Sequence, residues 1–206
     1  MTQTAMDMDT RPLPAGWKWA RLEEVIASIQ PGFACGERSE TGTVQLRMNN
    51  VTTSGNFDWS DVTRIPSDYK DFSRYWLQSN DVLFNNTNSA ELVGKSTIFN
   101  GFEEGVVFSN HFSRLRPADD KLEPNFLAKW LQSKWKDGTF NHICNRWVGQ
   151  AAVPKAKLLD LYIPLPPLEE QKRMAAILNE QMAGIQLAEE SIQQELETIE
   201  AMPAAL

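Results

Sequence analysis

The stretch that decides the fold is PPLEEQKRMAAILNEQMAGIQLAEESIQQELETIE, residues 166–200. Its opening prolines end the segment before them, and proline is tolerated at the first position of a helix. Glu169 and Glu170 fall in the first turn, where the helix dipole favours carboxylates. Pro203 follows the last periodic residue. The stretch therefore predicts one long helix.

The apolar residues of this helix recur with a period of seven, which is typical of a coiled coil. A helix that packs on its own domain drifts towards a period of about 3.6 instead. We therefore expect residues 166–202 to form a coiled-coil spacer that dimerises, and a helix folded back on its own domain is the alternative. Glu189 interrupts one row of the seam. The expected dimerisation residues are Ala175, Leu178, Met182, Ile185, Ile192, Leu196 and Ile199.

Residues 13–165 contain short segments typical of β-strands, separated by turns rich in Gly, Asn, Asp and Ser. Residues 1–12 are expected to be a flexible lead-in. Helices are expected near Arg21–Ser28 and over Pro124–Lys136, where apolar residues share one face. The pattern predicts an α+β protein: a mixed or antiparallel β domain with small helices, followed by the long helix. The strand candidates are Val44–Met48, Val62–Ile65, Asp81–Phe84, Ser96–Phe99, Val106–Phe108, Phe112–Leu115 and, as a last strand or extended segment, Leu158–Leu165.

Length and composition argue against a membrane protein and against a secreted one. The 206 residues are enough for one domain and an appendage. No stretch approaches the roughly 20 apolar residues of a membrane span. Met1–Thr10 does not resemble a secretory signal, so we expect a cytoplasmic protein with no membrane contact. Cys35 and Cys144 are then expected to be reduced thiols.

The formal charge of −7 is distributed unevenly. From Leu168 onward, eight glutamates oppose Lys172 and Arg173, whereas the first 167 residues carry nearly equal numbers of acidic and basic side chains. A near-neutral domain can still present a basic face to DNA. The acidic helix is suited to a basic protein surface or to solvent.

Enzyme motifs are missing from the sequence. Gly94-Lys95-Ser96 lacks the upstream glycine of a phosphate-binding loop. His111 and His142 are the only histidines, too few for a multi-histidine metal site. The single Pro-Pro pair precedes Leu168 rather than an aromatic residue, unlike the catalytic loop of an adenine methyltransferase. Glu170-Gln171-Lys172 lacks the further aspartate of a magnesium nuclease. We expect no catalysis, no metal and no cofactor in this chain.

Four stretches resemble the specificity subunits of type I restriction–modification systems, and together they span about residues 13–180. The most specific is the last one, where a Gly-Gln strand is followed by the entry to the long helix. Asn85, in the third stretch, stands where an arginine is common in the family. The four stretches are Leu13–Trp17 with Leu22–Val25, Leu46–Val51 with Gly55–Asp58, Asn80–Asn86 with Leu92–Lys95, and Gly149–Val153 with Ile163–Gln171.

The resemblance implies that residues 13–165 are a target recognition domain that reads double-stranded DNA. Members of the family usually carry two such domains and two such helices in one chain, whereas this sequence has one of each. That difference implies a half-subunit that forms a homodimer, or a piece of a longer chain. The resemblance also implies a methyltransferase subunit as partner, which would hold S-adenosylmethionine, and a restriction subunit as a further partner.

Polar residues in loops that flank strands are the candidate DNA contacts, because Asn and Gln can pair with adenine and Arg with guanine. The alternatives are asparagines that stabilise turns and lysines or arginines that are solvated surface charges. The seven tryptophans are expected in the core rather than on bases. The predicted DNA-binding residues are Arg47, Asn49, Asn50, Asn85, Asn86, Thr87, Asn88, Ser89, Lys95, Arg114, Arg116, Arg146, Gln150, Lys155 and Lys157.

Three other functions stay open at this point. One is a standalone nucleic-acid-binding or inhibitory module that pairs with other specificity subunits. A second is a nuclease or methyltransferase fragment, against which the missing motifs count. A third is a structural coiled-coil adaptor, which would leave the Asn-rich clusters unexplained.

Overall fold

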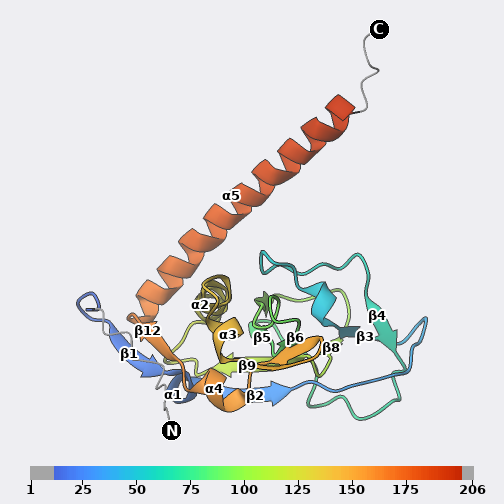
Figure 1. Cartoon of the computed structure of the whole chain (residues 1–206), viewed down its shortest axis with the longest axis horizontal. Coiled ribbons are helices and arrows are strands. Elements are labelled where there is room, and N and C mark those ends of the chain that lie inside the picture. Colours follow the sequence, from blue (N-terminus) through green and yellow to red (C-terminus); the bar gives the residue numbers. More distant parts are fainter. Residues whose placement is uncertain (1–11, 201–206) are drawn as a thin grey trace.

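A long helix, α5 (Leu168–Glu200), projects from a body of short strands and helices in the computed structural model, which describes residues 12–200 (Figure 1). The bounds of α5 match the prediction from the heptad repeat. The α+β class is confirmed, because antiparallel and mixed sheets combine with small helices. The predicted lead-in, apart from its last residue, and the last two residues of the predicted spacer lie outside the described residues.

The main sheet has four antiparallel strands in the order β2-β9-β5-β7. The inner strand β5, DVLFN, pairs with β9 and β7 and is buried along its whole length. Val82 and Phe84 lie in the core on one face of the sheet and Leu83 lies in a second core on the other. The strands are β2 (Ile26–Pro31), β5 (Asp81–Asn85), β7 (Ser96–Phe99) and β9 (Phe112–Pro117).

A second sheet has the order β4-β3-β8 and is mixed, since β3 runs antiparallel to β4 and parallel to β8. Its apolar residues form a second core with Leu83 and Phe112 of the main sheet. The strands are β3 (Thr43–Leu46), β4 (Thr63–Ile65) and β8 (Val106–Phe108).

Two small sheets join distant parts of the chain. β1 (Lys18–Arg21) pairs with β12 (Tyr162–Leu165) and so brings the two ends of the domain together. β11 (Gln150–Ala152) pairs with β10 (Asn145–Trp147) and with β6 (Thr87–Asn88). The sequence pattern predicted β12, which lies within Leu158–Leu165, and the resemblance implied β11, whereas β1, β6 and β10 were not predicted.

The helix α2 (Pro124–Lys136) packs across the main sheet, as predicted. Glu123 caps its first turn by accepting a hydrogen bond from the Phe126 amide at 2.6 Å. The predicted helix near Arg21 is a single turn, α1 (Leu22–Val25), because the chain then pairs with β9 as β2. The remaining helices are η1 (Met48–Asn50), α3 (Thr139–Ile143) and α4 (Lys155–Leu159).

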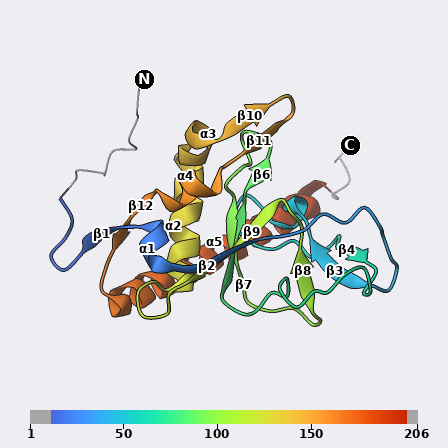
Figure 2. The same ribbon diagram turned by 90° about the horizontal axis from the view of Figure 1, so that it is seen from below.

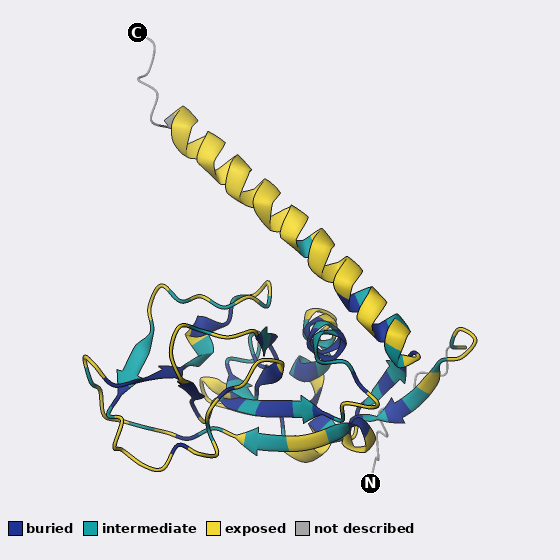
Figure 3. Cartoon of the chain, turned by 180° about the vertical axis from the view of Figure 1, so that it is seen from behind, coloured by how far each residue is buried: buried dark blue, intermediate teal, exposed yellow. Residues whose placement is uncertain are grey.

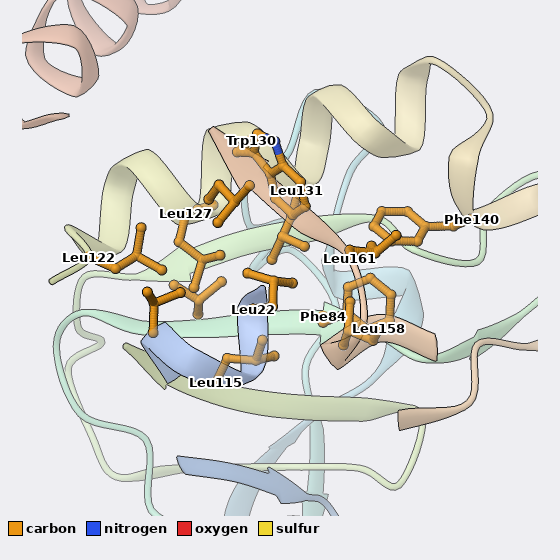
Figure 4. Packing of buried hydrophobic residues seen from close by; sticks show 14 of the residues in the cluster. Leu22, Phe84, Leu115, Leu122, Leu127, Trp130, Leu131, Phe140, Leu158 and Leu161 are labelled. Atoms are coloured by element: carbon orange, nitrogen blue, oxygen red, sulfur yellow. The ribbon is translucent and has the colours of Figure 1, made fainter. Parts of the chain in front are cut away.

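The largest core lies between α2 and the main sheet (Figure 4). Leu127 and Leu131 are fully buried against this sheet, and Phe84 of β5 meets Phe140 of α3 edge to face at 4.9 Å. Aromatic pairs in this geometry add about 0.5–1.5 kcal/mol beyond the burial of their area. This core fixes the ends of β5, from which the candidate site extends.

Only the first turns of α5 pack on the domain. Gln171, which is 1% exposed, accepts a hydrogen bond from the Glu123 amide at 2.9 Å and donates to the carbonyls of Lys121 and Pro166. Ala175 is 3% exposed and lies in the domain core, so its predicted place in a dimer seam is corrected. Residues 183–199 of the helix are exposed (Figure 3). The helix is thus docked at its start, touches the domain once more where Asn56 donates a hydrogen bond to Gln186, and is exposed for the rest of this length.

Candidate functional site

The segment after β5 holds the second Asn-rich cluster, and two of its asparagines point inward. Asn85 is 0% exposed and Asn88 is 8% exposed. The Asn85 amide donates to the carbonyls of His111 and Thr87 at 2.9 and 3.2 Å, and Asn88 donates to the Asn85 side-chain oxygen. Their hydrogen-bonding groups are used inside the protein, so we remove both from the set of predicted DNA contacts. They hold in place the turn that carries the half-buried residues Asn86, Thr87 and Ser89.

Asn50 and Lys95 support η1 from behind. Asn50, 2% exposed, accepts a hydrogen bond from the Arg47 amide and donates to the carbonyls of Asp58 and Asp61. The Lys95 ammonium bonds to the carbonyls of Met48 and Val51, and burial lowers its pKa. Asn50 and Lys95 also use their hydrogen-bonding groups inside the protein, so we remove both from the set of predicted DNA contacts.

Two predicted phosphate contacts are engaged with a buried carboxylate. Asp81 is 2% exposed and accepts two hydrogen bonds from the Arg116 guanidinium. The Arg114 Nε lies 3.8 Å from Asp81, and its Nη1 donates to the Trp76 carbonyl at 2.9 Å. These three residues form an ion cluster within the sheet, so Arg114 and Arg116 also leave the set.

A polar face remains at the ends of these elements, made of Arg47, Asn49, Asn86, Thr87 and His111. Asn86 donates to the Asn110 carbonyl, and the Thr87 amide donates to the His111 carbonyl at 3.4 Å. Burial, and next the charge of Arg47, lower the pKa of His111. Arg47, Asn86 and Thr87 are thus half-buried around the loop of Asn110 and His111, and Asn49 is exposed on η1 two residues after Arg47. The Asn86 side chain also accepts a hydrogen bond from Ser113, so it is held within this loop region. Ser89 is half-buried at its edge.

A hairpin of β10 and β11 stands out beside this face (Figure 2). The β10–β11 hairpin turns at Val148 and Gly149, and Gly149 has a φ of 77°, which L side chains rarely adopt. Trp147 is 62% exposed and Val148 is 104% exposed. Arg146 and Gln150 are exposed on the same hairpin. Apolar side chains held in solvent at a hairpin tip are typical of a contact surface.

Trp147 corrects the expectation that the tryptophans form core. Trp130 is buried and four others are half-buried, but Trp147 and, less so, Trp76 are exposed. Trp147 and Val148 are also the site residues that sequence reasoning missed. The signal that would have found them is two apolar residues directly before Gly149 in a stretch too short to form a buried strand.

The two predicted lysines of α4 lie near the base of the β10–β11 hairpin. Lys157 donates a hydrogen bond to the Ile143 carbonyl at 2.9 Å, and both lysines are exposed. Lys155 and Lys157 border a shallow depression together with Arg21 and Asp160, which form an ion pair. Lys155 and Lys157 stay predictions as phosphate contacts.

Within residues 12–200 no three His, Cys, Asp or Glu side chains are grouped as a metal site requires. Cys35 and Cys144 are not joined to each other. None of the helices in this part of the chain combines the length and apolarity that a membrane crossing requires. The arrangement of the site therefore offers polar, aromatic and basic side chains for binding.

Comparison with known proteins identifies related sequences. The family model described as type I restriction modification DNA specificity domain matches residues 14–198. The putative type I restriction enzyme MjaX specificity subunit of Methanocaldococcus jannaschii is 31% identical over 173 residues, which cover 82% of this chain and 40% of that subunit. The type I restriction enzyme StySPI specificity subunit of Salmonella potsdam is 25% identical over 93% of this chain and 42% of its own length. The chain thus spans about two fifths of these relatives.

Solved structures give the same result for the fold. The HsdS subunit from Thermoanaerobacter tengcongensis matches with a TM-score of 0.61 and 25% identity, over 93% of this chain and 44% of that one. A chain from a study of complex assembly and conformational transition of the type I R-M system matches with a TM-score of 0.67 and 24% identity, over 94% of this chain and 46% of that one.

Proposed function

This chain belongs to the type I restriction modification DNA specificity domain family, and on that premise we propose that it is a non-catalytic DNA-reading half-subunit of a type I methyltransferase complex. Its recognition domain reads one half of a double-stranded site. Two copies, paired through α5, read a bipartite inverted repeat with an unread gap. The methyltransferase subunit binds S-adenosylmethionine and performs the chemistry, and a restriction subunit is a further partner.

The polar face and the β10–β11 hairpin are the proposed DNA contacts. The hairpin brings Arg146 and Gln150 out beside Asn86 and Thr87, through the pairing of β11 with β6. A two-stranded ribbon fits the width of the major groove, where glutamine and asparagine can recognise adenine. Trp147 and Val148 would supply apolar contact to bases or sugars. Lys155 and Lys157 would contact the phosphate backbone.

The observation that carries the proposal of a dimer is the apolar stripe on the free part of α5. Ile185, Ile192, Leu196 and Ile199 are 48–62% exposed and follow the heptad spacing. Exposure of such an apolar stripe to water is unfavourable unless another surface covers it. A second copy, related by two-fold symmetry, carries the same stripe and can cover it. Pairing is antiparallel in this proposal, so the two recognition domains lie at opposite ends of the helices.

The length of α5 bounds the DNA site. Its 33 residues extend about 50 Å at 1.5 Å per residue. Half-site centres are then at most about 15 base pairs apart. Overlap of the helix ends with the recognition domains shortens this distance.

Solution mass tests the dimer. The wild-type chain should have twice the chain mass of 23.3 kDa by light scattering. The double variant Ile185→Asp/Ile192→Asp should have the mass of one chain. Leu187→Asp is the matched control, because Leu187 is 67% exposed but lies outside the heptad rows, and it should leave the dimer intact. A wild-type monomer, or a double variant that still dimerises, would contradict the proposal.

The same stripe supports a second function, an inhibitory module that pairs with a different specificity subunit. Mixing the chain with the methyltransferase subunit from its own genome separates the two functions. A complex of two chains with methyltransferase copies favours the half-subunit. A chain that ignores the methyltransferase but binds a full-length specificity subunit favours the inhibitor.

A further inference from the structure

A groove runs between α5 and the loop that follows η1. The loop contributes the aromatic side chains of Phe57 and Trp59, and α5 contributes Met182 and Ile185. The loop and the helix are joined at one point, where Asn56 donates a hydrogen bond to Gln186 at 3.2 Å. The groove therefore begins on the heptad seam of α5 and continues onto the recognition domain.

Two lysines of α2 border this region without a carboxylate partner. The Lys129 ammonium donates to the Met182 sulfur at 3.0 Å, and a thioether is a weak acceptor. Lys136 lines the groove together with Glu189 of α5. Within residues 12–200 neither lysine forms an ion pair with a carboxylate. Lys129 is half-buried and Lys136 is exposed, and an acidic group placed against them would offset the repulsion between their charges.

A polar stripe on α5 carries such acidic groups. Asn179 donates to Asn125 of α2 at 3.4 Å, and Gln186 accepts from Asn56, so this side of the helix faces the domain. Further along the same side, Glu190 and Glu197 accept hydrogen bonds from Gln186 and Gln193. The first part of the stripe on α5 thus lies on the side of α2 and its lysines, and the part nearer the end of α5 bears carboxylates.

Two-fold symmetry brings the two ends of this stripe together. In an antiparallel pair of identical helices, equivalent flanks lie on the same side of the interface. A register that sets Met182 against Ile192 of the second copy also sets Leu178 against Leu196, and it places Glu189, which interrupts the heptad row, against Ile185. The carboxylates of Glu190 and Glu197 of that copy then lie on the flank where α2 presents its lysines.

We propose that the groove between α5 and the Phe57–Trp59 loop receives the end of α5 from a second copy, whose Glu190 and Glu197 pair with Lys129 and Lys136. This lysine clasp rests on the proposed dimer. It binds each recognition domain to α5 of both copies, rather than only to α5 of the same chain. The distance and angle between the two domains, and hence the gap in the DNA site, are set by the clasp as well as by the seam.

Charge reversal tests the lysine clasp. Variant A carries Lys129→Glu and Lys136→Glu, and variant B carries Glu190→Lys and Glu197→Lys. Each homodimer then places like charges in the clasp, and its dissociation constant should rise at least about tenfold by analytical ultracentrifugation. An equimolar mixture of A and B restores opposite charges at both ends. It should form heterodimers with a dissociation constant close to that of the wild type.

The mixture also controls for folding, because a misfolded variant cannot regain affinity by mixing. If A and B each dimerise as tightly as the wild type, or if the mixture is no tighter than either variant alone, the lysine clasp is overturned. A wild-type monomer would overturn the proposed dimer together with the clasp. A wild-type dimer that Ile185→Asp/Ile192→Asp dissociates but charge reversal leaves intact would overturn the clasp alone.

Discussion

The side-chain amide of Asn88 donates a hydrogen bond to the side-chain oxygen of Asn85 at 2.6 Å, in the interior of the domain. The same Asn85 binds the His111 carbonyl, which lies on a different loop. One buried amide pair therefore holds together the turn after β5, the loop before β9 and, through β6, the β10–β11 hairpin.

Asn85→Ala is expected to destabilise the protein rather than to change its DNA preference. The substitution leaves the Asn88 amide without its acceptor and removes one of the two donors to the His111 carbonyl, which keeps the Thr87 amide. A buried polar group without a partner costs about 1–3 kcal/mol, and the free energy of unfolding in urea should fall by about this amount. Asn100→Ala, at an exposed position, should leave it unchanged. An Asn85→Ala protein of normal stability and reduced DNA affinity would return Asn85 to the DNA surface.

The fate of the asparagines shows what the sequence could and could not predict. An asparagine in a buried network and one that faces solvent stand in similar turn-rich sequence. Asn85 is buried because its amide binds the His111 carbonyl. His111 lies far along the chain, so a local sequence pattern cannot predict this contact. Asn49 is exposed and Asn86 is half-buried, and both stay predictions as DNA contacts.

Helices and strands were predictable where the local sequence pattern favours the same structure as the tertiary contacts do. Ser96–Phe99, Val106–Phe108 and Pro124–Lys136 have the bounds expected from their apolar runs and turn residues. The resemblance implied a strand at Gly149–Val153, which is β11, but the pattern did not predict β10, whose residues are all exposed, nor the pairing of β11 with β6, far earlier in the chain. The heptad repeat predicted α5 but not that its first turns, including Ala175, pack on the domain.

Trp147→Ala is expected to weaken DNA binding without unfolding the protein. The side chain is 62% exposed, so its removal leaves no cavity. Loss of a large apolar contact of about 1.4 kcal/mol raises the dissociation constant about tenfold. Fluorescence anisotropy with a labelled duplex, selected by the wild-type chain, measures the change. Trp147→Phe, which keeps most of the contact, should bind more tightly than Trp147→Ala, and equal affinity of all three proteins would exclude Trp147 from the interface.

Arg146 and Gln150 should have different effects on DNA binding. Arg146→Ala is expected to weaken binding to selected and unselected duplexes alike, and to lower the slope of log affinity against log salt by about one. Gln150→Ala is expected to weaken binding to the selected duplex only, because amides read base edges. Lys172→Ala, on the exposed side of α5, is the control for loss of a positive charge. A uniform loss in both variants would make Gln150 a backbone contact.

The stability of the domain should depend on His111 in mildly acidic solution. Burial and Arg47 lower the pKa of His111 from about 6.5, so the unfolded chain takes up a proton that the folded domain resists. The free energy of unfolding should therefore decrease as the pH falls below about 6.5, down to the lower pKa of the folded state. His111→Gln should remove this part of the pH dependence, and His142→Gln controls for the loss of an imidazole. An unchanged slope in His111→Gln would contradict the assignment.

Selection of duplexes from a random pool by the purified chain would show whether a symmetric dimer reads DNA. We predict an enriched inverted repeat, with two identical half-sites separated by an unread gap of constant length. Half-site centres should be no more than about 15 base pairs apart. A single ungapped site without symmetry, or no enriched sequence at all, would contradict the account of a DNA-reading half-subunit that pairs through α5.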